Sequence, residues 1–404
     1  MIHVRDAGNW LKAGRLAMGV LFLSANLAVL VSFTPAAEGA SATSGFEQEW
    51  AKLIKAAQKE GRLGIAAGGA PSREYRSVIA TFQDKFNIKV SLSTGSGSAT
   101  IDRVLAERKA GSYTVDIGLT SVAATRTRLI PANALSPIPP LLVHPEVLNK
   151  SAWFGDRHWY ADPEEEKFSF IYAVEPTVSF EFWYNTDAIS KEEIATIKTP
   201  ADLLNPKWRG KITSRTWGDR GRVGEMQNIY FQPSLGLAWI KEFFTHSGAR
   251  FSDDVRLRES WVVGGSVPIG FSDGDLDRGL RKLAKAGMPV ALRSIPYDLP
   301  FLTSGGSGCC IQVYDRAPNP NSAKLFLNWF LSKDGQTAVH QVTPGIERQS
   351  LREDIPFGSV PPQYRRVPGK KYIFRDADPK YVAQDEKQRD AIVAAWNESR
   401  RDSK

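Results

Sequence analysis

Three arginines in one loop are the residues of this sequence best suited to hold a charged ligand. Arg215, Arg220 and Arg222 lie in the glycine-containing segment 214–224, which also contains Trp217. An arginine guanidinium binds a carboxylate or a phosphate through two parallel hydrogen bonds, which a lysine ammonium cannot match. The tryptophan could stack on a flat ligand or cover a cleft. The alternative interpretation is solvated surface charge, because most arginines in proteins are exposed.

A run of small residues in another part of the chain offers hydrogen-bond donors. The segment 89–103 predicts a strand with alternating apolar residues, a turn at 94–98 and the start of a helix that ends at Gly111. A helix N-terminus carries unpaired backbone N–H groups and a partial positive charge, and small side chains let a ligand approach them. The alternative is a connecting loop that contains glycine only because its turn requires it.

Other predicted strands also end in small polar residues. Gly68-Gly69 follows a strand at 63–67, and Thr120-Ser121 ends a strand at 115–121. In parallel sheets, ligands bind outside the carboxyl ends of the strands, where such residues meet. The candidate ligand-binding residues, including the end of a later strand at 267–272, are therefore Gly68, Gly69, Ser96, Gly97, Ser98, Thr120, Ser121, Arg215, Trp217, Arg220, Arg222, Ser272 and Asp273.

The surrounding pattern of elements predicts an α/β fold. Apolar spacing indicates helices at 46–60 and 75–82 around the strand at 63–67. Repeated β-then-α units favour a parallel sheet with helices on both faces. A second set of such units begins at Thr199, where Thr199, Pro200 and Asp202 mark a helix start.

Longer predicted elements connect the two sets of βα units or follow the second set. Two strands at 168–174 and 178–184, broken at Glu175-Pro176, suit a crossing between two lobes. Residues 319–335 predict a single helix, because Asn319-Pro320 is a typical start and Gly335 a typical end. A last amphipathic helix is expected around 392–396.

Composition and charge restrict the class of protein. The chain has 404 residues and a net charge of +8, but its basic and acidic residues are mixed along the sequence. No recognition motif accompanies the charge, so we do not expect nucleic-acid binding. The two cysteines, Cys309 and Cys310, are adjacent; since neighbouring cysteines rarely reach disulfide geometry, we interpret them as buried strand residues.

The first 42 residues are typical of an export signal. A basic start with Arg5, Lys12 and Arg15 precedes a mostly apolar run at 16–31, and Ala40-Ser41-Ala42 resembles a cleavage site. The alternative is an uncleaved anchor, but the apolar run is shorter than a spanning helix needs and contains Asn26. We therefore expect a protein located in the periplasm after cleavage.

Three stretches together resemble the periplasmic solute-binding proteins of ABC importers, in the family that includes ferric-ion, thiamine and aminoethylphosphonate binders. They are residues 50–61, which end in Lys-Glu-Gly, residues 201–212 with the run Asn-Pro-Lys-Trp-Arg-Gly-Lys, and residues 317–336. The segment Tyr184-Asn185-Thr186-Asp187 also fits the family's pattern. The resemblance covers about residues 46–345.

The resemblance implies a two-lobed type 2 periplasmic binding protein fold, with hinge strands and an interlobe cleft. After the signal peptide at 1–42, it implies a first lobe of residues 43–175 and 288–316 and a second lobe of residues 176–287 and 317–404. The implied function is the substrate-binding component of an ABC transporter, which captures a small, anionic solute and delivers it to the membrane permease. We expect a monomer whose partners are that ligand and the permease subunits.

Two alternatives remain open at this point. One is a ferric-ion binder, but ferric-binding members of the family use an adjacent tyrosine pair that this chain lacks, and its five histidines have no metal-ligand spacing. The other is an exported hydrolase, but no nucleophile elbow, zinc motif or phosphate-loop lysine is present. Asp273 and Asp275 are better explained as a helix start than as a catalytic pair. We therefore expect no catalytic residues, no metal and no cofactor.

Overall fold

The computed structural model describes residues 38–69, 75–271, 273–304, 308–342, 348–358, 360, 362 and 365–401. The basic and apolar parts of the predicted signal, together with Ser272, lie outside these residues. The predicted cleavage motif at 40–42 falls within the first turns of helix α1 (Glu38–Glu60), which begins earlier than the apolar spacing indicated. Within the described chain, no helix is both long enough and apolar enough to cross a membrane.

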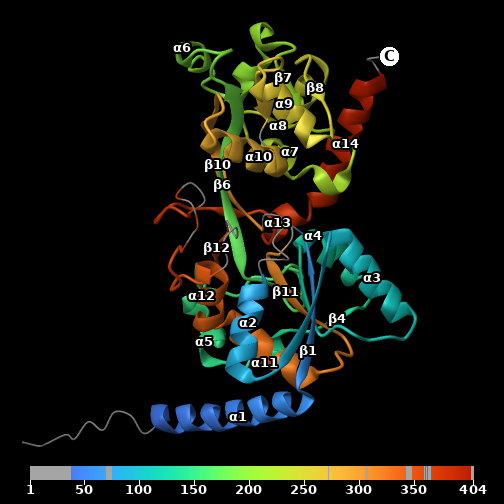
Figure 1. Ribbon diagram of the computed structural model, residues 1–404, viewed down its shortest axis with the longest axis vertical. Helices are drawn as coiled ribbons and strands as arrows, with labels where there is room; N and C mark the ends of the chain where they lie inside the picture. Colours follow the sequence, from blue (N-terminus) through green and yellow to red (C-terminus); the bar gives the residue numbers. More distant parts are fainter. Residues whose placement is uncertain are drawn as a thin grey trace, which may run out of the picture. The chain divides into compact units, whose positions relative to one another are not determined.

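The first sheet contains the strands that the small-residue turns predicted. Its order is β2-β1-β3-β11-β4, and β5 also pairs with β11. Strand β1 is parallel to β2 and β3, whereas β11 is antiparallel to β3. The strands are β1 (Arg62–Gly68), β2 (Lys89–Gly95), β3 (Ile117–Thr120), β4 (Leu135–Ser136), β5 (Phe170–Ile171) and β11 (Cys310–Tyr314), and the helices beside them are α2 (Tyr75–Phe86), α3 (Gly97–Lys109), α11 (Pro320–Leu331) and α12 (Lys333–Val342). The expected parallel βα units are thus confirmed at β1, β2 and β3 (Figure 1).

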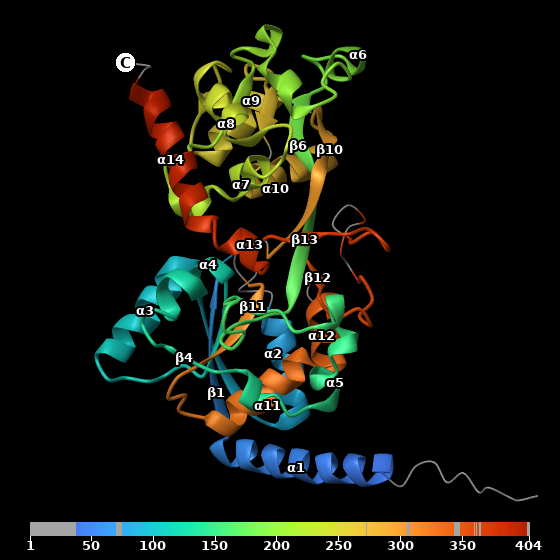
Figure 2. The ribbon, with the colours of Figure 1, turned by 180° about the vertical axis from the view of Figure 1, so that it is seen from behind.

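The second sheet has the order β13-β10-β6-β9-β7-β8, and β12 also pairs with β6. Its strands are β6 (Ala173–Asn185), β7 (Ile212–Ser214), β8 (Arg250–Phe251), β9 (Ile269–Phe271), β10 (Val290–Thr303), β12 (Gln349–Ser350) and β13 (Ile373–Phe374). Its helices are α7 (Gly224–Tyr230), α8 (Gly236–Thr245), α9 (Val255–Val263), α10 (Gly274–Lys285) and α14 (Asp385–Arg401). Figure 2 shows α14 beside α7 and α8, which it also contacts.

Short elements connect these layers. The short α-helices are α4 (Val122–Ala124), α5 (Pro145–Leu148), α6 (Lys191–Ile194) and α13 (Pro379–Val382). The 3-10 and π segments are η2 (Thr125–Leu129), η3 (Pro139–Leu141), η4 (Lys150–Ala152), η5 (Phe154–Asp156), η6 (Pro200–Leu204), η7 (Pro206–Trp208) and η8 (Arg220–Arg222). The predicted helix start at Thr199 is confirmed, since Thr199 and Asp202 form a reciprocal capping box at η6.

Strand β6 runs without a break through the position where the sequence predicted one. Pro176 lies opposite Leu302 of β10. On the other side of β6, β12 pairs only with Ala173 and Val174, and β9 only from Phe182 onward. Among the described residues, no strand pairs with β6 at Pro176 on that side, and such an edge position is where a sheet tolerates proline. The prediction of two strands was wrong, but the long β crossing that it described is present.

The predicted helix at 319–335 is two helices. Helix α11 starts at Pro320 as expected and ends at Leu331, because Ser332 has an extended backbone. Gly335 lies inside α12, where a Cβ atom would come within 2.1 Å of the Trp329 carbonyl oxygen. This glycine permits a close contact between two helices, and its interpretation as a helix end was wrong.

The adjacent cysteines form a disulfide, so the prediction that they stay unlinked was wrong. Both are fully buried, as expected. Cys309 lies in a bend just before β11, so the strand does not hold the two side chains on opposite faces.

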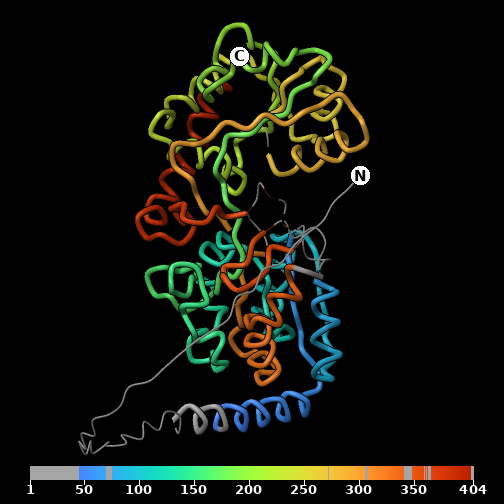
Figure 3. Tube along the Cα trace, turned by 90° about the vertical axis from the view of Figure 1, so that its left-hand side faces the viewer, coloured from blue at the N-terminus to red at the C-terminus, as the bar shows by residue number. Residues whose placement is uncertain are grey.

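Two main clusters of buried apolar side chains cover these sheets. The first core joins β1, α2 and α11 through residues such as Ile65, Phe82 and Phe326, and Figure 3 shows these early and late segments side by side. The second core joins β6, α8 and α14 through residues such as Phe180, Phe243 and Trp396. Helices α11 and α12 pack in the first core, although the resemblance assigned residues 317–404 to the second lobe. Strand β10 lies in the second sheet, although the resemblance assigned residues 288–316 to the first lobe. The contacts therefore favour other lobe boundaries, and the predicted boundaries stay a prediction.

A buried aspartate connects the first sheet to α11. The Asp116 carboxylate accepts hydrogen bonds from the backbone N–H of Gly64 at 2.7 Å and of Asn319 at 2.7 Å, and from Asn319 Nδ2 at 3.0 Å. Burial raises the pKa of Asp116, and these hydrogen bonds act in the opposite direction. The side chain thus satisfies backbone donors that water cannot reach.

We expect Asp116→Ala to lower the free energy of unfolding by about 2–4 kcal/mol, because it leaves buried donors without acceptors. Urea unfolding would measure the change. Asp315→Ala is the control, since that carboxylate is 44% exposed and should cost less than about 0.5 kcal/mol. Equal effects of the two substitutions would contradict the proposed role of Asp116.

Candidate ligand-binding cleft

A cavity of about 780 Å³ is lined by residues that the two sheets and the C-terminal segment supply. Of the predicted site residues, those that line it are Ser96, Gly97, Ser98, Thr120, Ser121, Arg215, Arg222 and Asp273. Gly68, Gly69, Trp217 and Arg220 do not line this cavity. Two of the first sheet's strand ends that the sequence singled out, at 96–98 and 120–121, therefore line one cavity, whereas the end at 68–69 does not.

The two glycines that end β1 have a packing role. A Cβ atom on Gly68 would come within 2.8 Å of the Gly97 Cα atom, so glycine lets α3 begin directly against the strand. Gly69 has a φ of 92°, which other residues rarely adopt. Gly68 therefore lets α3 start close to β1, and Gly69 provides the backbone turn that follows the strand.

On the side of the cavity that the first sheet forms, three hydroxyl groups already accept hydrogen bonds from other groups of the protein. Ser96 Oγ accepts a hydrogen bond from the Ala99 N–H at 3.3 Å, and Ser121 Oγ accepts one from the Ala124 N–H at 3.2 Å. Thr120 Oγ1 accepts a hydrogen bond from Gln312 Nε2 at 2.6 Å. Because a hydroxyl that accepts one hydrogen bond can still donate another, each remains able to bind a ligand oxygen.

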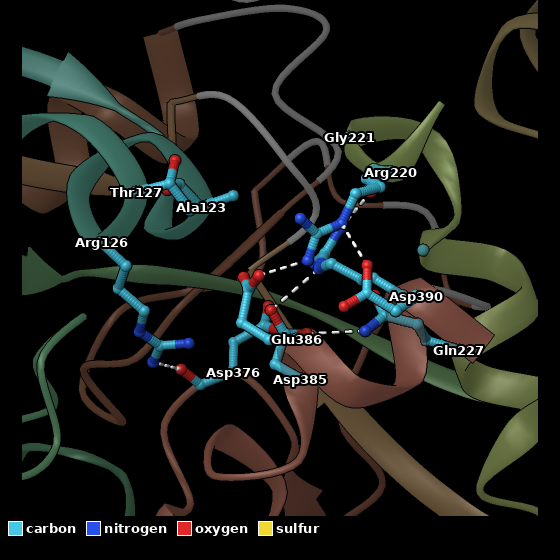
Figure 4. A network of polar contacts seen from close by, with 12 residues as sticks. Ala123, Arg126, Thr127, Arg220, Gly221, Gln227, Asp376, Asp385, Glu386 and Asp390 are labelled. Atoms are coloured by element: carbon cyan, nitrogen blue, oxygen red, sulfur yellow. Dashed lines mark hydrogen bonds and ion pairs between the residues drawn. The ribbon is translucent and has the colours of Figure 1, made fainter. Parts of the chain in front are cut away.

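Two of the three predicted arginines have carboxylate partners. Arg220 is exposed and pairs with Glu386 and Asp390 of α14, at 3.0 Å for Asp390 (Figure 4). Arg222 pairs with Asp253 at 3.2 Å. The contacts of Arg220 therefore favour the alternative interpretation of the sequence, in which this arginine is a solvated surface charge.

Arg215 differs from its neighbours in burial and in pairing. Its residue is 6% exposed, and it follows β7 at the end that borders the cavity. Its guanidinium lies 5.7 Å from the ring centre of the fully buried Trp217. Among the described residues, no carboxylate forms an ion pair with it, and its Nε has no hydrogen-bond acceptor. A buried cation without a counter-ion is costly, so an anionic ligand would complete its environment.

The sequence did not identify two cavity carboxyls. Glu225 opens α7 and Glu181 lies on β6. Burial, followed by the charge of Asp273, raises the pKa of Glu225 to about 7. Burial, followed by the charge of Asp277, raises the pKa of Glu181. Glu225 directly follows the glycine-containing arginine loop, which is the one signal that could have found it.

The C-terminal segment forms another wall that the sequence did not place. Arg375 Nη1 donates to Asn228 Oδ1 at 2.5 Å and to the Gly224 carbonyl at 3.0 Å. The Asp376 carboxylate accepts from the Ser304 N–H at 2.6 Å, and Arg126 donates to the Asp376 backbone carbonyl (Figure 4). The tail therefore contacts residues that belong to both sides of the cavity.

Further along the tail, α14 is held against the second core. Asp385 accepts a hydrogen bond from Gln227 Nε2 at 2.6 Å (Figure 4). The rings of Trp396 and Phe251 lie 4.8 Å apart. Within the described part of the chain, no group of three or more histidine, cysteine, aspartate or glutamate side chains is arranged to hold a metal ion.

The raised pKa of Glu225 should appear as a pH-dependent stability. Between the ordinary glutamate pKa and about 7, the unfolded chain loses this proton and the folded chain keeps it, so stability falls as pH rises through this range. We expect Glu225→Gln to be more stable than the parent by on the order of 2 kcal/mol at pH 8, with the difference vanishing near pH 4.5. Urea unfolding across this range would measure it. Glu386→Gln, at an exposed carboxylate, should show no such trend; a pH-independent difference for Glu225→Gln would refute the assignment.

Comparison with known proteins identifies the fold. No protein-family model matches the chain, and no curated protein matches its sequence. Among solved structures, ferric iron-binding protein A of Mannheimia haemolytica in an open conformation has a TM-score of 0.57 and 12% identity, over 84% of this chain and 98% of its own. The Trichodesmium protein IdiA (FutA), in complex with iron and citrate ligands, has a TM-score of 0.54 and 18% identity, over 84% of this chain and 99% of its own. AfuA, a periplasmic binding protein of Actinobacillus pleuropneumoniae with exogenous fructose-6-phosphate bound, has a TM-score of 0.51 and 18% identity, over 84% of this chain and 98% of its own. This chain has the two-lobed α/β fold of the periplasmic solute-binding proteins.

Proposed function

We propose that this protein is the extracytoplasmic substrate-binding component of an ABC transporter, and that it binds a small anionic solute in the cleft. The similar structures with this fold support the binding role, and they are binding proteins rather than enzymes. The basic and apolar N-terminal segment supports export to the periplasm. In this proposal the loaded protein delivers its solute to the membrane permease, and no catalytic step occurs.

The environment of Arg215 is the main support for the proposal of an anionic ligand. Every other arginine lining the cavity has a described hydrogen-bond or ion-pair partner, whereas Arg215 is buried without a carboxylate. A planar guanidinium held against the Trp217 ring is presented in one orientation, which suits a carboxylate or phosphate. The α3 N-terminus, without an acidic residue in its first turn, offers further donors from the opposite side of the cavity.

The same arginine argues against a bare ferric ion as the ligand. Several structures with this fold are described as iron-binding, and one of them holds citrate as well as iron. Another holds fructose-6-phosphate. A buried guanidinium repels a cation but attracts the anionic oxygens of citrate or of a sugar phosphate. We therefore favour an organic anion as the ligand of this chain.

Binding in such a cleft would be accompanied by closure. Strands β6 and β10 connect the two sides of the cavity and form the hinge in this proposal. Ligand groups that contact Arg215 on one side and the α3 N-terminus on the other would favour the closed state.

The decisive experiment tests the purified protein against inorganic phosphate, citrate, fructose 6-phosphate and ferric ion by thermal shift, followed by calorimetry. A true ligand at 100 times its Kd adds about 2.7 kcal/mol of stability. For the anion that binds, we expect Arg215→Ala to weaken affinity by about 2–5 kcal/mol, because it removes a desolvated charge pair.

Arg220→Ala is the matched control, since the Arg220 guanidinium is 47% exposed and already paired with α14. It should leave affinity unchanged. If Arg215→Ala binds the anion as tightly as the parent, the anion site is elsewhere. If ferric ion alone stabilises the parent, the metal-binding alternative replaces this proposal.

A further inference from the structure

A second cavity, of about 430 Å³, is formed by the segments 349–357 and 366–372 and by Phe154. This tail cavity shares no described lining residue with the cleft. Phe357 and Val367 line it, and they are two of the five large apolar residues that are exposed in the described part of the chain. Because exposed apolar residues that gather at a cavity mark binding surfaces, the tail cavity is a candidate ligand site.

A buried arginine forms part of the wall of the tail cavity. The side chain of Arg366 is 9% exposed, and its guanidinium lies 4.7 Å from the ring centre of Phe154. Its backbone N–H donates to Gln349 Oε1 at 2.8 Å, and its Nη2 donates to the Ser350 carbonyl at 3.3 Å. These contacts hold the guanidinium against one wall in a single orientation.

The other two nitrogens of this guanidinium are poorly satisfied. Among the described residues, Nε and Nη1 of Arg366 have no hydrogen-bond acceptor. The carboxylate of Glu353 forms an ion pair with Nη1 at 3.5 Å, but its side chain is 57% exposed. A solvated partner compensates a buried charge only in part. Because Glu353 also lines the cavity, an anion that enters can replace its carboxylate at the guanidinium.

We propose that the tail cavity is a second ligand site, and that it binds a small monocarboxylate with an apolar body. The carboxylate binds Arg366, and the exposed Lys370 on the same wall adds attraction. The hydrocarbon part lies against Phe357 and Val367. One buried guanidinium beside the acidic Glu353 suits a single negative charge better than a phosphate dianion. The site goes beyond the proposed transport function, because it does not use the cleft.

Matched probes test the two parts of this ligand separately. The purified protein is titrated calorimetrically with hexanoate and phenylacetate, with their neutral amides, and with acetate, which has the charge but a minimal apolar body. For at least one acid, we expect binding about 10-fold tighter than for its amide, because only the acid makes a charged hydrogen bond to Arg366. We expect the same acid to bind about 10-fold more tightly than acetate, because it buries more apolar surface. Arg215→Ala should bind the acid as tightly as the parent, since the tail cavity lies outside the cleft.

Variants assign the binding to the tail cavity. Arg366→Gln should weaken binding of the acid about 10-fold. Val367→Asp should also weaken it, through a like charge at a residue that is 53% exposed and whose replacement leaves the fold intact. Glu353→Gln should strengthen binding about 3-fold, because it removes the competing carboxylate. Arg157→Gln is the control and should bind as the parent does, since that guanidinium is 43% exposed and lines neither cavity.

Several outcomes would overturn the proposal. If neither acid binds the parent, or if acids and amides bind equally, no carboxylate site exists in the tail cavity. Binding that survives in both Arg366→Gln and Val367→Asp, or that is lost in Arg215→Ala, would place the acid elsewhere and refute the site. If the parent sediments as a dimer and Val367→Asp as a monomer, a second copy of the chain covers the exposed apolar residues, and the ligand site is refuted. The function proposed for the cleft is tested independently, by phosphate, citrate and fructose 6-phosphate.

Discussion

The antiparallel pairing of β6 with β10 is the constraint on which the cleft depends. The pairing extends from Asn185 opposite Val290 to Glu175 opposite Thr303, with one irregularity between Pro296 and Phe301. At one end, Val174 of β6 is buried in the first core, and further along Phe180 is buried in the second. A two-stranded ladder can bend where its register shifts, so it joins two separately packed cores without fixing them rigidly. Glu181 of β6 and Tyr297 of β10 line the cavity, so the two strands that connect the cores also form part of the cavity wall.

Charge pairing explains which polar residues are structural and which remain for a ligand. The buried Arg258–Asp273 pair sits at the start of α10, where Asp273 also caps the Leu276 N–H at 3.1 Å, so both groups stabilise the fold. Arg375 and Asp376 do the same for the tail through Asn228 and Ser304. Since desolvated charges are costly unless compensated, a fold tolerates few that are not. In the proposed function, an anionic solute would compensate Arg215, which has no carboxylate partner among the described residues.

The sequence predicted the positions of the strand ends better than the roles of the residues on them. Alternating apolar residues and small-residue turns located β1, β2, β3 and the start of α3, because these signals are local. Arg215 and Arg220 have the same chemistry in the same loop, and only the packing of α14 against that loop decides which one is paired. Tyr297 could not be found for the same reason, since β10 reaches the cavity from a part of the chain that is distant in sequence from the arginine loop. Pro176 and Gly335 were misread as breaks because their open edge and their helix contact are tertiary features.

The comparison with known structures separates what a shared fold determines from what it does not. At 12–18% identity, the similar chains share the fold of this chain. Their described ligands nevertheless include iron with citrate and a sugar phosphate, so the arrangement permits several chemistries. The choice among them lies in single side chains that follow strand ends. In this chain, Arg215 follows β7 at the cavity and has no carboxylate partner among the described residues, which is why the proposed ligand is an anion and not a bare cation.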